Sequence, residues 1–178
     1  MKQDFALSEI TGFLLIFAMI TLIAAVFSAA VLPGILEEQE RIQSEEILFN
    51  FAALKEGMDA LSLSDEPGLT RRQILSPQKF GDACLSLSYG KPVVSNGITY
   101  REFTISYETK GQLLLTLDGC GLKKNTENIL PSSYSYVVNP HNTAEQMEHT
   151  EPFRIDYTWQ GSFVNAGRTY QIFSVRFT

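Results

Sequence analysis

Three side chains that bind metal ions are spaced four residues apart between His141 and His149. On a helix, His141, Glu145 and His149 would share one face, and imidazole and carboxylate groups are ligands of zinc and other divalent metals. The stretch follows Asn139-Pro140, however, and its polar composition is typical of a surface loop. We therefore interpret it as a polar loop, and we predict no metal site and no cofactor.

The two cysteines, Cys84 and Cys120, are the only other residues that suggest covalent chemistry. In a reducing compartment they would remain two separate thiols, whereas in an exported domain a disulfide between them is favoured. Because other features of the sequence favour export, we predict a disulfide that closes a loop of about 37 residues. Asp118 to Gly121 should then form the tight turn that presents Cys120.

The sequence contains no motif typical of an enzyme. A phosphate-binding loop, a dinucleotide-binding fingerprint, a nucleophile elbow and a paired metal-binding cysteine motif are all missing. The formal net charge is -6, so the surface should repel the phosphates of nucleic acids. We predict that the protein is not an enzyme and has no nucleic-acid partner.

An uncharged run of 27 residues, from Ile10 to Leu36, dominates the N-terminal region. Because a helix rises ~1.5 Å per residue, residues 10–32 can cross the ~30 Å hydrocarbon core of a bilayer. A secretory signal has a shorter apolar core and a basic start, so a signal peptide cut after residues 28–30 is the less favoured interpretation. A plain membrane anchor is the simpler alternative. We predict that residues 10–32 form the transmembrane or assembly part of a helix, with a local break at Pro33-Gly34.

Beyond this break the helical pattern becomes amphipathic. Charged residues such as Glu45 and Glu46 are numerous, while apolar residues recur every three or four positions, at Ile47, Phe51, Leu54, Met58 and Leu61. We therefore predict one long helix over residues 5–61, with an amphipathic part at 35–61. Its apolar stripe should pack on the domain that follows.

From residue 83 onward, apolar and polar residues alternate in the manner of β-strands. The alternating runs lie at residues 84–89, 102–107, 112–117, 134–138, 153–159 and 173–177. Glycines at Asn96-Gly97, Lys110-Gly111, Gly161 and Ala166-Gly167 predict hairpins between them. The predicted fold class is α+β. A long N-terminal α-helix, apolar and then amphipathic, packs on a mostly antiparallel β-sheet or sandwich domain formed by residues 62–178.

The residues before the apolar run identify a family resemblance. Phe5-Ala6-Leu7-Ser8-Glu9 is similar to the Phe-Thr-Leu-x-Glu start of mature bacterial type IV pilins, in which an apolar helix follows. Ser8 to Phe13 looks like the S-[EP]-x-x-G-F start of many archaeal pilin-like proteins. Asp4 stands where bacterial leaders have glycine. The N-terminal helix therefore resembles those of the type IV pilin superfamily, and specifically of its archaeal members.

This resemblance implies a leader of residues 1–4, removed by a prepilin peptidase between Asp4 and Phe5. It implies assembly roles for Phe5 and Glu9, and it implies membrane lipid and other pilin-like subunits, or copies of this chain, as partners of the helix. The implied function is that of a structural subunit of an archaeal type IV pilus-like surface filament, with the β-rich domain outside the cell membrane. The alternative is a single-span, membrane-anchored extracytoplasmic binding module that does not polymerise.

Overall fold

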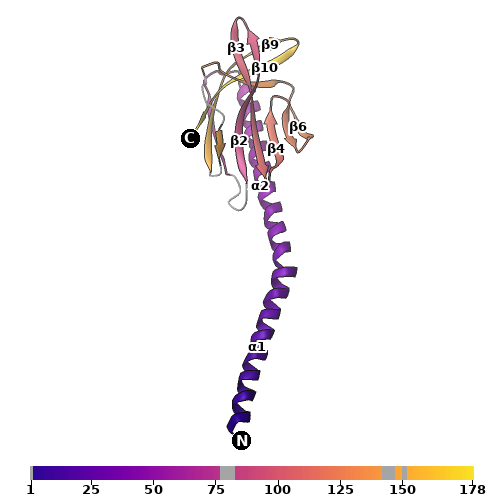
Figure 1. Ribbon diagram of the computed structural model, residues 1–178. Helices are drawn as coiled ribbons and strands as arrows, with labels where there is room; N and C mark the ends of the chain where they lie inside the picture. Colours follow the sequence, from indigo (N-terminus) through magenta and orange to yellow (C-terminus); the bar gives the residue numbers. More distant parts are fainter. Residues whose placement is uncertain (1, 77–82, 142–146, 150–151) are drawn as a thin grey trace. The chain divides into compact units, whose positions relative to one another are not determined.

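The computed structural model describes residues 2–76, 83–141, 147–149 and 152–178. The chain divides into two compact units, Met1–Ser44 and Glu45–Thr178. The first contains helix α1 (Lys2–Ala30) and the start of helix α2 (Leu32–Leu63). The second contains the rest of α2 and all the described strands (Figure 1). The compact unit thus begins before the β-rich domain predicted at 62–178, because the end of α2 belongs to it.

The long predicted helix is present as α1 and α2, interrupted at Val31. Pro33 has no N–H, so it cannot donate the helical hydrogen bond to the residue four positions earlier. Helical bonds continue on both sides, because Val31 N donates to Phe27 O at 3.0 Å and Ile35 N donates to Val31 O at 3.2 Å. The predicted break is therefore local, and the helix resumes after one residue.

In the second unit, the predicted apolar stripe of α2 is buried against the sheet. Each of its side chains is at most 4% exposed, as measured for Ile47, Phe51, Leu54, Met58 and Leu61. These residues join one core with the inward-facing residues of the strands. The prediction that this part of the helix packs on the β-rich domain is confirmed.

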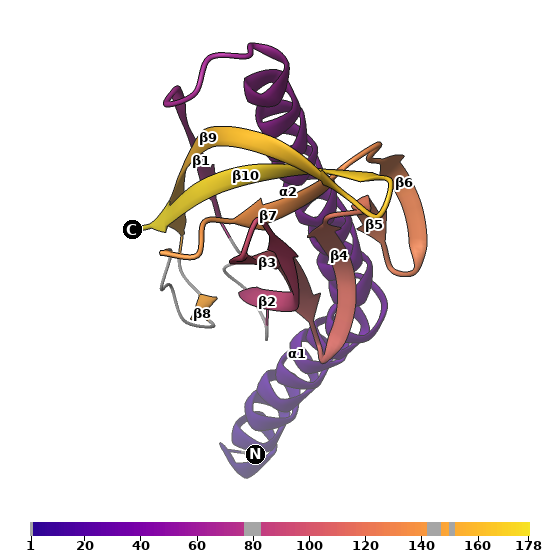
Figure 2. The same cartoon turned by 90° about the horizontal axis from the view of Figure 1, so that it is seen from above.

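The ten described strands form a single sheet, which Figure 2 shows curving around α2. The main order is β1-β9-β10-β7-β3-β4-β5-β6, while β2 pairs with β3 and with β8. Among the described strand pairs, β10–β7 alone is parallel. The strands are β1 (Thr70–Leu75), β2 (Cys84–Ser95), β3 (Ile98–Thr109), β4 (Gln112–Asp118), β5 (Gly121–Lys124), β6 (Glu127–Pro131), β7 (Ser135–Val138), β8 (Met147–His149), β9 (Phe153–Asn165) and β10 (Arg168–Phe177). The α+β fold class is as predicted, with one curved sheet in place of a sandwich.

Three of the four predicted hairpins are present. Asn96-Gly97, Lys110-Gly111 and Ala166-Gly167 each have two successive positive φ angles, which a two-residue turn between twisted strands requires. The hairpin predicted at Gly161 is wrong, because β9 continues through this residue. Gly161, with a φ of 143°, lies where the β9–β10 register shifts. Gly161 therefore marks a local irregularity inside β9.

A polar cluster joins α2 to β7 at the edge of the core. Lys55 Nζ lies 2.6 Å from Asp59 Oδ2, and the Lys55 side chain is only 9% exposed. The other oxygen of the Asp59 carboxylate accepts a hydrogen bond from the Tyr136 hydroxyl. Ser62 Oγ, one turn further along α2, lies 3.4 Å from the Tyr134 hydroxyl. Because buried polar groups are costly without partners, this cluster fixes how α2 sits on β7.

Burial changes the proton affinity of the two tyrosines in this cluster. Desolvation, with a smaller contribution from the nearby Asp59, raises the pKa of Tyr134 to about 12. Desolvation and the bond to Asp59 also raise the pKa of Tyr136. In both cases the folded state disfavours the tyrosinate form.

We therefore expect alkaline unfolding of the second unit. An unfolded tyrosine ionises near pH ~10, so the stability that these two groups contribute is present below that pH. It is lost as the pH rises towards about 12, the folded pKa of Tyr134. Tyrosinate absorbance and circular dichroism should change together in this window, and Tyr134→Phe should make the transition shallower. Full ionisation near pH ~10 without loss of structure would contradict the expectation.

Candidate functional site on the N-terminal helix

Helix α1 exposes an apolar surface around its whole circumference. Its large apolar side chains from Ile10 to Phe27 are 51–70% exposed, including the four consecutive residues from Leu14 to Phe17. Four consecutive residues cover every side of a helix. Soluble monomers rarely expose contiguous apolar patches of this size, so this surface needs lipid or protein around it.

The hydroxyl groups of this segment have partners within the helix itself. Thr21 Oγ1 donates to Ala18 O at 2.9 Å, and Ser28 Oγ donates to Ala24 O at 2.8 Å. Neither hydroxyl therefore needs water, and both can enter hydrocarbon. Within the described part of the chain, one helical stretch, Ile10–Leu63, includes a segment long and apolar enough to cross a membrane or to act as a signal.

The residues predicted to act in processing and assembly lie in the first turns of α1. Asp4, Phe5 and Glu9 are all within the helical span that begins at Lys2. Phe5 and Glu9 are four residues apart, so the backbone places them on one face of the helix. Their roles stay predictions that the fold does not test.

An acidic segment follows the apolar surface along α2. Glu37 and Glu38 are exposed, and Glu38 Oε1 lies 2.7 Å from the guanidinium of Arg41. The hydrogen bond from Arg41 lowers the pKa of the Glu38 carboxyl, so this group stays ionised. An exposed ion pair adds little stability, and the segment's main property is its negative charge.

The predicted disulfide is wrong, because the sulfurs of Cys84 and Cys120 are not bonded to each other. Strands β2 and β4 lie on opposite sides of β3, where Cys84 pairs with Glu108 and Leu117 pairs with Ile105. Two strand spacings and the offset along β3 separate the cysteines by on the order of 15 Å, about twice the Cα distance that a disulfide allows. The tight turn is present, since Cys120 N donates to Asp118 Oδ1 at 2.7 Å.

The metal-binding candidates do not share a helix in the described residues. His141 is exposed after Asn139, whose side chain accepts a hydrogen bond from His141 N at 2.9 Å. His149 is on strand β8, paired with Leu85 of β2. Glu145 lies outside the described residues. Within those residues, no group of three metal-binding side chains is close enough to hold an ion.

Two further surface residues, Phe49 and Arg71, were not identified from the sequence. Phe49 is 73% exposed on α2, although it lies two residues from the buried Phe51. Its position outside the three-and-four spacing of the buried stripe is a sequence signal that identifies it. Arg71 lies on β1, a strand without the alternation that would reveal its orientation.

The class of protein that these features define is a pilin-like α+β protein. A long N-terminal apolar helix continues into a helix that packs on a mostly antiparallel sheet. Comparisons with protein-family models, curated proteins and solved structures gave no match. The pilin-like description therefore rests on the architecture and on the N-terminal residues alone.

Proposed function

We propose that this protein is a structural subunit of an archaeal type IV pilus-like surface filament. The observation that carries the proposal is the exposed apolar surface that surrounds α1. Before assembly this surface anchors the subunit in the membrane, with the β-rich unit outside the cell. After assembly the same side chains pack against the helices of neighbouring subunits. When such helices move from lipid into a filament, the main gain is in van der Waals contacts between neighbouring helices. A helix that is apolar on all sides can make these contacts in every direction.

Glu9 and Phe5 align the incoming subunit. Cleavage between Asp4 and Phe5 gives Phe5 a free α-amine, close to the start of the apolar surface. A filament core contains little water, so an isolated carboxylate or ammonium group there is costly. Pairing of Glu9 with the Phe5 amine of a neighbouring subunit removes both costs and selects one axial register. The simpler role for Glu9, at the positive end of the α1 dipole, requires no neighbour.

Substitution of Glu9 by glutamine tests this role, because it keeps the shape of the side chain and removes its charge. We expect Glu9→Gln cells to contain folded, membrane-inserted protein but few or no surface filaments by electron microscopy. The matched control is Glu127→Gln, which removes an exposed carboxylate at the start of β6 in the second unit and should leave filaments unchanged. Normal filaments in Glu9→Gln cells would contradict the assembly role.

The N-terminal residue of the wild-type protein separates the proposal from its alternative. Mass spectrometry of protein sheared from the cell surface should find Phe5 as the first residue. A wild-type protein that keeps Met1 and forms no filaments would contradict the filament function. That result would favour the single-span, membrane-anchored binding module.

A further inference from the structure

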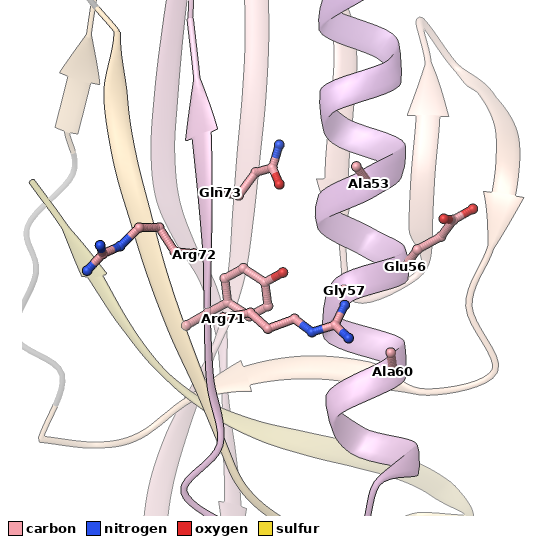
Figure 3. Close-up of a pocket in the computed structure, with 8 residues that line it drawn as sticks. Ala53, Glu56, Gly57, Ala60, Arg71, Arg72 and Gln73 are labelled. Carbon is pink, nitrogen blue, oxygen red and sulfur yellow. The ribbon is translucent and has the colours of Figure 1, made fainter.

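A cleft of about 520 Å³ lies between α2 and strand β1, within the second unit (Figure 3). One wall is formed by Ala53, Gly57 and Ala60 of α2, and the other by Arg71 and Gln73 of β1, with Tyr157 between them. In the described sheet, β1 pairs only with β9, so its other edge is open. We name this feature the α2–β1 cleft.

The helical wall of the cleft is made of small residues, and Gly57 at its centre is buried against Tyr157. A Cβ atom on Gly57 would lie 2.1 Å from the Tyr157 hydroxyl oxygen, so α2 can approach β9 this closely only with glycine there. Ala53 and Ala60 are four residues before and three residues after Gly57, and their side chains end at Cβ. Small residues at such spacing allow a second helix to approach closely, although they do not by themselves identify one.

The second feature of the cleft is the positive charge of Arg71 on its β1 wall. Figure 3 shows the Arg71 side chain extending across the cleft towards Gly57 and Ala60. Glu56 also lines the cleft, and its carboxylate lies on the side away from Arg71. Among the described residues, no carboxylate lies within ion-pair distance of Arg71, whereas the neighbouring Arg72 is 2.7 Å from Asp156. Arg71 is exposed and is therefore available to an acidic partner.

An exposed aromatic side chain extends this surface along α2. Phe49 is 73% exposed, and it precedes Ala53 by four residues, so the two lie on one face of the helix. The surface therefore combines an aromatic group, a shallow helical wall and a positive charge. Aromatic residues and arginine are the types most enriched where protein interfaces bind strongly.

The chain itself contains a segment that matches this surface. Residues 37–46 are helical and contain five glutamates and one arginine. The apolar Ile42 in their midst is 53% exposed. The negative segment complements Arg71, and Ile42 offers an apolar contact for Phe49. The net charge of the whole chain is -6, so two copies repel each other. A positive side chain at the contact between them offsets this repulsion.

We propose that the α2–β1 cleft binds the acidic helical segment, residues 37–46, of a second copy of this chain. The proposal rests on the proposed filament function, and it names one contact between subunits outside the apolar helices. Arg71 selects the acidic segment, while the small side chains of Ala53 and Ala60 let it approach.

Charge reversal at Arg71 tests the contact in cells that express the full chain. We expect Arg71→Glu to reduce surface filaments at least about tenfold, because like charges replace an attractive pair in the interface. The matched control is Arg154→Glu, which makes the same change in charge at an exposed position of β9, in register with Ile74. It should assemble normally. Circular dichroism should show both variants folded, and combining Arg71→Glu with Glu37→Lys and Glu46→Lys should restore filaments.

Photo-cross-linking identifies the occupant directly. A photoreactive amino acid at Gln73, which lines the cleft, should cross-link to residues 37–46 of another copy in assembled filaments. Cross-links to another protein, to a β-strand added along β1, or to lipid would overturn the proposal. Wild-type filament numbers in Arg71→Glu cells would also overturn it and would leave the filament function intact. An absence of filaments from wild-type cells would instead contradict both.

Discussion

Replacing Phe51 by alanine is expected to lower the free energy of unfolding by about 3–5 kcal/mol. The Phe51 side chain is 0% exposed and belongs to the stripe by which α2 packs on the curved sheet. Its removal loses the transfer free energy of a buried aromatic ring and leaves a cavity that neighbouring side chains fill only in part. Chemical denaturation of the full chain in detergent micelles, followed by near-ultraviolet circular dichroism, measures the change.

Phe49→Ala is the matched control for Phe51→Ala. It makes the same substitution on the same helix, at a side chain that is 73% exposed, and should change stability by less than about 0.5 kcal/mol. Equal losses for the two variants would mean that helix propensity, and not burial, determines the result. Phe49→Ala should nevertheless weaken assembly if the α2–β1 cleft binds a second copy.

Replacing Asp59 by alanine is expected to cost about 3 kcal/mol, the second large effect. The substitution leaves the Lys55 ammonium group, whose side chain is 9% exposed, without its carboxylate. It also removes the acceptor of the Tyr136 hydroxyl, which comes from a fully buried residue. Each stranded group loses its partner without regaining full contact with water. Denaturation of the full chain in the same micelles provides the measurement.

Two further variants separate the charge from the hydrogen bond at Asp59. Asp59→Asn keeps an oxygen that can accept from Tyr136 but leaves Lys55 unpaired, so it should also destabilise the protein. Adding Lys55→Met to Asp59→Asn removes the stranded charge and should recover much of the loss. If the double variant is no more stable than Asp59→Asn, the ion pair is not the source of the effect.

The elements with a clear period could be predicted from the sequence. The buried stripe of α2 and strands such as β3 and β10 alternate or repeat because one side of each faces the core. Strand β1 was missed because it is an edge strand with only Leu75 buried, so its residues carry little pattern. Strands β5, β6 and β8 have three to five residues each, too few to show a period.

The candidate site could be predicted only where it depends on local sequence. The apolar surface of α1 follows from composition alone, since no charge occurs between Ile10 and Leu36. The separation of Cys84 from Cys120 depends on the register of two strands against β3, which no local pattern specifies. Arg71 likewise reaches the α2–β1 cleft only because β1 pairs with β9, more than eighty residues away.

The stripe of α2 that enters the core has a mechanical consequence. This helix begins at Leu32, within the first unit, and ends at Leu63, after its stripe has packed on the sheet. A tension applied along α2 from its N-terminal end is therefore carried through helical hydrogen bonds into the core. Mechanical unfolding of the second unit requires Phe51, Leu54 and Met58 to slide past the sheet at the same time. The side chains that stabilise the folded unit are therefore also those that resist an applied tension.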